Sequence, residues 1–590
     1  MRQPLPTPFT ALLLWALCTL AAMPAGAKGA LAMQAMAPPA NAVAPPGQLG
    51  GRLQLSTLQE LTLTVLRDDH GLASQPALAL DSLPLLDATY LQVDGDLVPR
   101  QRGLVTTGHP HWDWLLEPGR VWQDADGSRH ISLPFALQEK NANCTHNGVL
   151  RARLGANGEA FPVTVLMASE TCQYLQFNLE GSLKGRFYAE PVADAQAIAA
   201  GHRRLLAARL PTRPLSALFA PGDQAGPAAL AGPGQHLSAW GLASGDTHYV
   251  SDCPTRRGPY PHCDFLSLPS YSLAKSLVGG LGLMRMEQRA PGSRTQRIAR
   301  LIPACAQVPG WDAVTVGDAL NMQTGHYASA APQADEASEA MSSGFFLPSR
   351  HTQKLRFACG GWPRRGPPGG TFVYHTSDTY LVGAALNALL AQHTGQPGDF
   401  YDALLRPLWR ALALSPSLDT TRRSAGAGGQ PFTGYGLTLL RDDIVRLGQA
   451  LTHNALAHNT LAHNIPTHNK LAPQLDATML RQALQQEPEQ RGAHPAQAPG
   501  IYYQHGFWGY DATRLLGCSE QRVIPFLSGY GGISVLLLPD GRVYYAFGDG
   551  GQFAFADALR WLHQQQPLCA GTATRTTTAT AATTTTGRPE

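Results

Sequence analysis

A serine and a lysine stand three residues apart at the head of a mostly apolar stretch of this chain. Ser272 and Lys275 lead into residues 276–280, and the pattern predicts the start of a helix. At this spacing both side chains lie on one helix face. A lysine held among apolar residues must have a pKa well below its usual value of about 10.4, so that it loses its proton. Ser272 would then be a nucleophile with Lys275 as its base.

The same pair has an ordinary structural interpretation, in which Ser272 caps a helix and Lys275 is a solvated side chain. Lysines are rare in the chain, and Lys275 is the only one with a serine three residues before it. The pair alone does not choose between the two interpretations, so the decision depends on other motifs.

A tyrosine precedes a second predicted helix. Tyr374 lies just before a stretch in which Ser377 or Asp378 is expected to cap the helix. A phenol at this place can move a proton to or from a reacting group. It is protonated at neutral pH, so the role requires Lys275 as its electrostatic neighbour.

Glycines precede a predicted strand further along. Residues 528–533 read Ser-Gly-Tyr-Gly-Gly-Ile and lead into an apolar run. Glycines at a strand edge let a substrate carbonyl approach the backbone closely. The backbone amide of Ile533 is therefore expected to pair with that of Ser272 as an oxyanion hole.

The order of these motifs resembles the serine β-lactamase and penicillin-binding-protein superfamily, above all its class C β-lactamase-like esterases and 6-aminohexanoate-dimer hydrolases. Residues 270–276 are similar to the S-x-S-x-x-K-S run of that branch, and residues 372–383 match its tyrosine motif. Residues 311–325 resemble its Val-Thr…Leu-x-Met-x-Ser-Gly segment, and residues 433–443 its Gly-Gly-Leu…Arg-Asp segment. The resemblance covers residues 235–560, and several motifs in one order make it specific.

The resemblance implies a fold and a mechanism. The fold is of the α+β class, an antiparallel sheet flanked by helices with a helical subdomain. Ser272 is the implied nucleophile, Lys275 its base and Tyr374 the proton shuttle, with the amides of Ser272 and Ile533 as the oxyanion hole. Acylation of the serine is followed by attack of water, and no metal or cofactor is required. Four residues at the motif positions are expected to contact substrate: Thr376, Tyr530, Gly531 and Gly532.

Two motifs depart from the lactam-active members of the family. Thr376 stands where those members carry Asn or Ser, and residues 530–532 stand where they carry Lys-Thr-Gly. The missing lysine would have gripped the carboxylate of a β-lactam or peptide. A small-molecule or peptide-like ester or uncharged amide is the expected substrate. The alternatives are a D,D-peptidase or β-lactamase, and an exported binding protein that kept this fold without turnover.

The amino-terminal part of the 590-residue chain changes pattern twice. Residues 1–27 are typical of an export signal, which predicts a periplasmic or secreted protein without stable membrane insertion once the signal is cleaved. Residues 28–50 are rich in Ala, Pro and Gly and predict a linker. Short alternating segments between turns in residues 51–195 predict a β-rich, sandwich-like accessory domain.

Residues 210–570 mix helical and strand patterns and form the expected hydrolase domain. A His-Asn repeat at residues 451–470 has a period of five, which fits neither a helix nor a strand face, and predicts a surface insertion. Residues 571–590 are rich in Thr and Ala and predict a disordered tail.

Charge and cysteine content limit the remaining function classes. A formal charge of +3 and the lack of a basic stripe argue against nucleic-acid binding. Eight cysteines beyond the expected signal suggest disulfides in an exported protein. Sequential pairing is expected, although the sequence does not choose among the possible pairings: Cys144, Cys172, Cys253, Cys263, Cys305, Cys359, Cys518 and Cys569.

Overall fold

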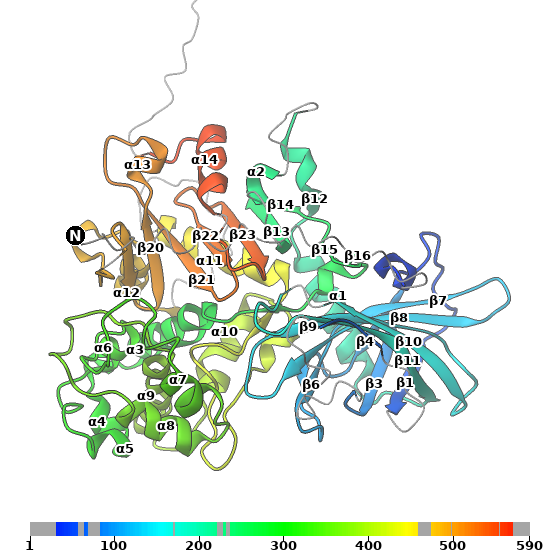
Figure 1. Ribbon diagram of the computed structural model, residues 1–590. Coiled ribbons are helices and arrows are strands. Elements are labelled where there is room, and N and C mark those ends of the chain that lie inside the picture. The colour runs from blue at the N-terminus through cyan, green and yellow to red at the C-terminus, as the bar shows by residue number, and fades with distance from the viewer. Residues whose placement is uncertain are drawn as a thin grey trace, which may run out of the picture.

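Two β-sheets organise the chain, and helices surround the second of them (Figure 1). The computed structural model describes residues 31–56, 64–68, 83–168, 171–220, 228–231, 237–457, 474–496, 498–553 and 555–569. The expected export signal, the tail and most of the His-Asn repeat lie outside these ranges. Within them, no helix has both the length and the apolar character needed to cross a membrane.

The accessory domain is one antiparallel sheet. Its eleven strands are β1 (Gly50–Ser56), β2 (Thr64–Asp68), β3 (Leu86–Val93), β4 (Asp96–Pro99), β5 (Gly103–Val105), β6 (Trp112–Leu116), β7 (Gly119–Gln123), β8 (Arg129–Glu139), β9 (Thr145–Arg153), β10 (Ala160–Ala168) and β11 (Phe177–Ala189). The strand order is β5-β6-β8-β7-β4-β3-β1-β11-β10-β9, β2 pairs with β11 beside this path, and β9 pairs back onto β8. The expected β-rich domain is confirmed, but its strands close into a ring instead of stacking as two layers.

Alternating side chains fill the inside of this ring. Leu53 and Leu55 of β1 are buried, and Gln54 between them is partly exposed. Trp112 and Trp114 of β6 are fully buried in the same cluster. The alternation that suggested strands thus also supplies the core.

The stretch expected as a linker is packed in the part that the structure describes. Residues 33–36 form the short helix η1 (Met33–Met36), and both of its methionines are buried in the main core. The backbone N–H of Met33 donates to Arg257 O at 2.7 Å. This segment therefore joins the two domains through contacts as well as through the chain.

The second sheet has eight strands. They are β12 (Thr212–Pro214), β13 (Leu237–Ser244), β14 (Thr247–Val250), β19 (Ile501–Gln504), β20 (Phe507–Asp511), β21 (Val523–Gly529), β22 (Ile533–Leu537) and β23 (Val543–Gly548). Their order is β12-β14-β13-β23-β22-β21-β20-β19, and every pair except β12–β14 is antiparallel. Helix α1 (Ala195–Ala208) connects the accessory domain to this sheet.

Helices cover both faces of the second sheet. Val535 and Leu537 of β22 pack in the same core as α11 (Arg441–Ala457), whereas Leu536 packs in the core that contains α14 (Phe555–Gln565). Successive side chains of a strand point to opposite faces, so this split follows directly from the sequence. Figure 1 shows the two helices on either side of strands β21 to β23.

A helical subdomain is inserted between β17 (Leu268–Pro269) and β18 (Thr438–Leu439). Its elements are the π-helices η6 (Lys275–Gly280), η8 (Ser342–Phe346) and η9 (Tyr401–Leu405), and the α-helices α3 (Leu281–Arg289), α4 (Ile298–Leu301), α5 (Pro303–Ala306), α6 (Val316–Leu320), α7 (Glu339–Met341), α8 (His351–Gly360), α9 (Thr376–Thr394) and α10 (Arg406–Ala411). The expected α+β architecture of sheet, flanking helices and helical subdomain is present.

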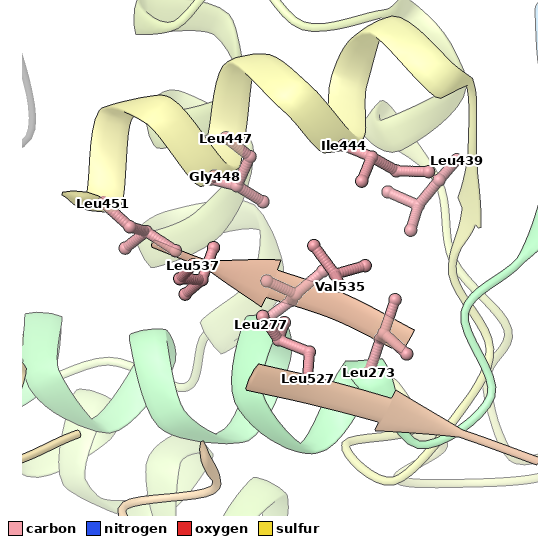
Figure 2. Close-up of a pocket in the computed structure, with 10 residues that line it drawn as sticks. All are labelled: Leu273, Leu277, Leu439, Ile444, Leu447, Gly448, Leu451, Leu527, Val535 and Leu537. Atoms are coloured by element: carbon pink, nitrogen blue, oxygen red, sulfur yellow. The ribbon is translucent and has the colours of Figure 1, made fainter. Parts of the chain in front are cut away.

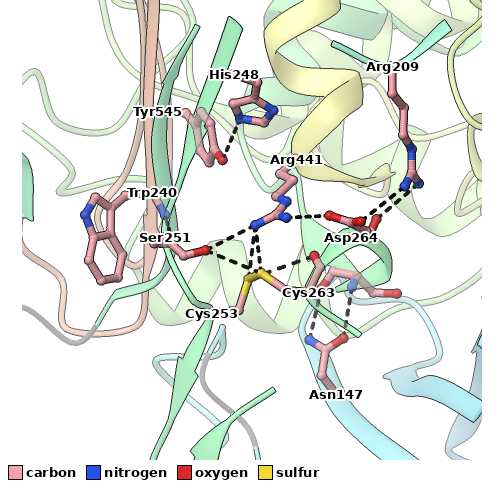
Figure 3. Close-up of a disulfide and its surroundings, with 11 residues drawn as sticks. Asn147, Arg209, Trp240, His248, Ser251, Cys253, Cys263, Asp264, Arg441 and Tyr545 are labelled. Carbon is pink, nitrogen blue, oxygen red and sulfur yellow. Dashed lines mark hydrogen bonds and ion pairs between the residues drawn. A yellow bond between two sulfur atoms is a disulfide. The ribbon is translucent and has the colours of Figure 1, made fainter. Parts of the chain in front are cut away.

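The eight cysteines form four sequential disulfides, as expected: Cys144–Cys172, Cys253–Cys263, Cys305–Cys359 and Cys518–Cys569. The Cys253–Cys263 bridge lies beside Arg441, the first residue of α11 (Figure 3). The Arg441 guanidinium donates to Ser251 O at 3.1 Å and to Cys263 Sγ at 2.9 Å. The disulfide region thereby fixes the start of the helix that backs the sheet.

Two buried carboxylates of the accessory domain, Asp113 and Glu117, bond to residues of the second domain. Arg422 is buried and pairs with Asp113 of β6, and its Nε donates to Gln138 Oε1 of β8 at 2.7 Å. Arg102 Nη2 lies 2.6 Å from Glu117 Oε2. The Glu117 carboxylate also accepts a hydrogen bond from the Ser417 hydroxyl of the second domain. Breaking one partner of such a pair leaves an uncompensated buried charge, so these contacts hold the domains in one arrangement.

Candidate active site

Ser272 lies in the turn between β17 and the helical run that continues through η6 and α3. Behind it, Leu273 and Leu277 pack between α11 and strands β21 and β22 (Figure 2). About 10 Å³ of internal space remains there, which is room for roughly one water molecule. The helix that carries the serine and the lysine is therefore packed on its apolar side.

Lys275 is 1% exposed and its ammonium group points at Ser272. Lys275 Nζ lies 2.9 Å from Ser272 Oγ, 2.8 Å from Thr376 Oγ1 and 3.3 Å from Gly434 O. Burial lowers the pKa of Lys275 to about 8, although the nearby Glu336 carboxylate acts in the opposite direction. Among the described residues no carboxylate forms an ion pair with Lys275, so its neutral form is accessible near neutral pH.

Gly434 lets its carbonyl reach the lysine. A Cβ at this position would lie 2.5 Å from Thr376 Cγ2 and 2.9 Å from Thr379 Oγ1. Neither distance is tolerable, since both side chains are buried at the start of α9. The segment after residue 433 thus contributes one of the three acceptors around Lys275, a contact that the sequence did not predict.

Tyr374 lies over the same pair. Lys275 Nζ is 4.8 Å from the centroid of its ring, and its hydroxyl is in hydrogen-bonding reach of Ser272. The ring stacks on Trp508 at 5.8 Å. Burial, with the nearby Glu336 carboxylate, raises the pKa of Tyr374 above the usual value, so the phenol is protonated and is a proton donor.

Glu336 is a functional candidate that sequence reasoning missed. Its carboxylate accepts from Thr376 N at 2.8 Å and also from Thr376 Oγ1. It therefore caps α9 from a loop 40 residues earlier, and the expected local cap at Ser377 or Asp378 is wrong. A carboxylate at a helix N-terminus is favourable, and this one also acts on Lys275 and Tyr374.

A buried histidine ties the Glu336 loop to the helix start. His375 Nε2 lies 3.0 Å from Asp335 Oδ2, and its ring stacks on Trp362. Burial alone would lower the pKa of His375, but Asp335 and Asp378 outweigh it and raise this pKa to about 9. The protonated imidazole thus holds Asp335, the residue before Glu336, at the start of α9.

The residues of the third motif form a turn, and they face different neighbours. Tyr530 is 52% exposed, and its ring lies 5.8 Å from that of Tyr271 and 6.3 Å from that of Tyr174. Gly531 and Gly532 both have positive φ and lie against residues 548–552, where their missing Cβ atoms would meet backbone carbonyls. The turn therefore requires glycine at both positions. The backbone atoms nearest to these two glycines belong to residues 548–552.

A different glycine lies against the residues that flank Ser272. A Cβ at Gly529 would be 3.0 Å from both Ser270 O and Leu273 Cδ1. Gly529 ends β21, whose pairing with β20 stops at Phe526. Within the described ranges, the outer edge of β21 therefore has no strand partner over its last three residues, whereas Ile533 lies opposite Gly529 inside the β21–β22 hairpin.

The structure thus brings Ser272, Lys275, Tyr374 and Thr376 together and turns Gly531 and Gly532 toward another segment. A hydroxyl, a buried amine of depressed pKa and a protonated phenol in mutual reach can transfer a proton away from the hydroxyl and back to a leaving group.

Comparison with known proteins identifies the family of the second domain. The Beta-lactamase family model matches residues 267–569, just over half of the chain. Solved structures that resemble it include EstCE1, a hydrolase with promiscuous acyltransferase activity, at 15% identity and a TM-score of 0.41 over 62% of this chain and 100% of that one. A class C beta-lactamase has 13% identity and a TM-score of 0.35 over 55% and 89%. Simvastatin synthase (LovD) from Aspergillus terreus has 14% identity and a TM-score of 0.37 over 56% and 95%.

No curated protein sequence matches the chain. The family match, on a sheet and helical subdomain of the β-lactamase/transpeptidase type, identifies this chain as a member of the beta-lactamase family.

Proposed function

We propose that this protein is an exported serine hydrolase that cleaves an ester or an uncharged amide through an acyl-enzyme on Ser272. The observation that carries the proposal is the buried Lys275, whose Nζ lies 2.9 Å from Ser272 Oγ and whose pKa is lowered to about 8. A solvated helix-surface lysine would have neither property. Four disulfides fit an oxidising compartment outside the cytoplasm.

In the proposed acylation, neutral Lys275 takes the proton of Ser272 while Oγ attacks the substrate carbonyl carbon. The tetrahedral intermediate collapses when the leaving oxygen or nitrogen receives a proton from the Tyr374 hydroxyl, which is refilled from the Lys275 ammonium. Water then attacks the acyl carbon, the same groups remove its proton, and Ser272 leaves with a proton restored. Tyr374 starts in the protonated state that its surroundings favour, and the lowered pKa of Lys275 makes the neutral amine accessible.

We assign the oxyanion hole to the backbone amides of Ser272 and Tyr530. The assignment of Tyr530, in place of the expected Ile533, is supported by its position directly after Gly529, which contacts Ser270 and ends the stretch of β21 whose outer edge is open. An amide at an open strand edge can donate to a substrate oxygen, whereas one inside a hairpin is used by the sheet.

The wall above the nucleophile favours a neutral substrate. It is built from the rings of Tyr174, Tyr271 and Tyr530, and the Tyr174 hydroxyl donates to Glu139 at 2.8 Å. Burial raises the pKa of Glu139 to about 7, so this carboxyl takes up a proton near neutral pH. We find no cation among these wall residues that would hold a substrate carboxylate, which disfavours a D,D-peptidase or β-lactamase.

A matched pair of esters tests the substrate class. We expect p-nitrophenyl butyrate to be hydrolysed with a kcat/KM at least about tenfold above that of mono-p-nitrophenyl succinate, which differs by a carboxylate, because the wall offers that charge no partner. A preference for the anionic ester, or stable labelling by fluorescent penicillin, would favour the peptidase or β-lactamase alternative. No hydrolysis of either ester would favour the inactive binding protein.

The lowered pKa of Lys275 predicts the pH dependence. kcat/KM should rise with pH through about 8, because only the neutral amine accepts the serine proton. Glu336→Gln removes the negative charge that stabilises the ammonium, so the rise should move to lower pH. Glu339→Gln is the control, since Glu339 is exposed in the first turn of α7. A profile of Glu336→Gln that coincides with wild type would contradict this coupling.

A further inference from the structure

The residue before the nucleophile has a strained backbone. Tyr271 has a φ of 41°, in the left-handed region that bulky side chains rarely adopt, although it is buried and directly precedes Ser272. Such a conformation persists only where the surrounding contacts impose it. The direction in which Ser272 leaves the turn depends on this residue, so the contacts that impose its conformation also aim the nucleophile.

Those contacts come from the accessory domain. Asn143 lies in the loop between β8 and β9 and is 2% exposed. Its Oδ1 accepts from the backbone N–H of Tyr271 at 2.7 Å and from Ser270 Oγ at 3.0 Å. The peptide bond between Ser270 and Tyr271 is therefore held by a side chain 128 positions away in the sequence.

The same carboxamide holds the segment on the other side of the lysine. Asn143 Oδ1 also accepts from Gly436 N at 3.0 Å, and Nδ2 donates to Leu437 O at 3.0 Å. These residues follow Gly434, whose carbonyl is an acceptor for Lys275. One side chain thus joins the turn that carries the nucleophile to the segment that contacts its base.

The loop itself is anchored. Cys144, the next residue, is bonded to Cys172, and Thr145 Oγ1 donates to Ser267 O at 3.0 Å. Asn147 Nδ2 also donates to Ser267 O at 3.0 Å. Asn143 is therefore presented from a fixed position, as a residue that orients another group must be.

We propose that the accessory domain completes the active site, with Asn143 as a positioning residue that sets the conformation of the Tyr271–Ser272 turn. The proposal rests on the proposed role of Ser272. Asn143 touches neither substrate nor the reacting atoms, so its contribution is to the geometry of attack. Small displacements of a reacting group are enough to slow a reaction strongly.

Asn143→Ala leaves the Tyr271 amide without its acceptor. We expect kcat for p-nitrophenyl butyrate, and the rate of Ser272 modification by a fluorophosphonate, to fall by roughly 100-fold per folded molecule. The pH at which activity rises should stay near its wild-type value, because none of the side-chain hydrogen bonds of Asn143 reaches Lys275 or Glu336. A merely structural role would lower stability and leave the rate per folded molecule as it is.

Asn147→Ala is the matched control. Asn147 is 3% exposed in the same domain and exchanges hydrogen bonds with the backbone of Ser267, outside the turn. Its loss should lower the melting temperature to a similar extent with a labelling rate within about twofold of wild type. Equal rates for the two alanine variants would overturn the inference.

Two further outcomes are possible: the wild-type protein is not labelled, or Asn143→Ala does not fold. Absence of labelling in the wild-type protein would refute the proposed function, and with it this inference. If Asn143→Ala does not fold, Asn143→Gln decides, because it keeps the carboxamide but displaces it by one methylene. We expect this variant to react at least about tenfold more slowly than wild type, and an unchanged rate would refute the positioning role.

Discussion

Replacing Ser272 by alanine is expected to lower kcat for p-nitrophenyl butyrate by roughly 10⁴-fold or more, since loss of a covalent nucleophile removes the acyl-enzyme route. The fold should survive, because Lys275 keeps its bonds to Thr376 and Gly434. Stopped-flow and steady-state assays on the purified variant, with circular dichroism and melting curves, measure both effects.

Ser276 provides a control on the same helical run. Its hydroxyl is buried and donates to Gly506 O at 2.6 Å, away from the candidate nucleophile. Ser276→Ala should therefore reduce stability by about 1 kcal/mol and keep its turnover. If Ser272→Ala retained more than about a tenth of wild-type kcat, the acyl-enzyme on this residue would be refuted.

Replacing Lys275 by arginine is expected to lower kcat by roughly 10³-fold or more, although the positive charge remains. A guanidinium does not lose its proton in proteins, so it cannot take the proton of Ser272. If the lysine served only as a cation that orients Ser272, the arginine variant would keep much of its activity. Comparison of Lys275→Arg with Lys275→Ala therefore shows whether Lys275 acts as a proton acceptor or only as a positive charge.

A second buried lysine gives the matched control. Burial lowers the pKa of Lys354 to about 7, and its Nζ donates to Phe345 O at 2.7 Å among aromatic rings. It has no contact with Ser272 among the described residues. Lys354→Met should alter stability but leave the pH profile of hydrolysis in place. A shift of that profile in Lys354→Met would contradict the assignment of the pKa of about 8 to Lys275.

The sequence predicted those features that depend on short spacings. The S-x-x-K pair, the tyrosine before a helix and their order along the chain sufficed for the family and its α+β fold. The β-rich domain followed from alternation, but alternation is the same for a closed ring and for two stacked layers, so the ring could not be predicted. Sequential disulfides were expected, and the structure has them.

The long-range contributors to the site carried no sequence signal. Glu336 reaches Thr376 from a loop 40 residues away, and Asn143 reaches Tyr271 from another domain. Three glycines occur within four positions of the third motif, and only the folded structure shows that Gly529 is the one beside the residues that flank Ser272. Such contacts arise from tertiary packing, which single-sequence patterns do not encode.

The most direct test is the mass of the protein after reaction with a fluorophosphonate, followed by peptide mapping. The activated-serine account predicts one adduct per molecule on Ser272, formed faster at a pH above the Lys275 pKa of about 8 than below it and absent from Ser272→Ala. An unmodified Ser272 in the folded wild-type protein, or an adduct that forms equally fast in Lys275→Arg, would contradict it.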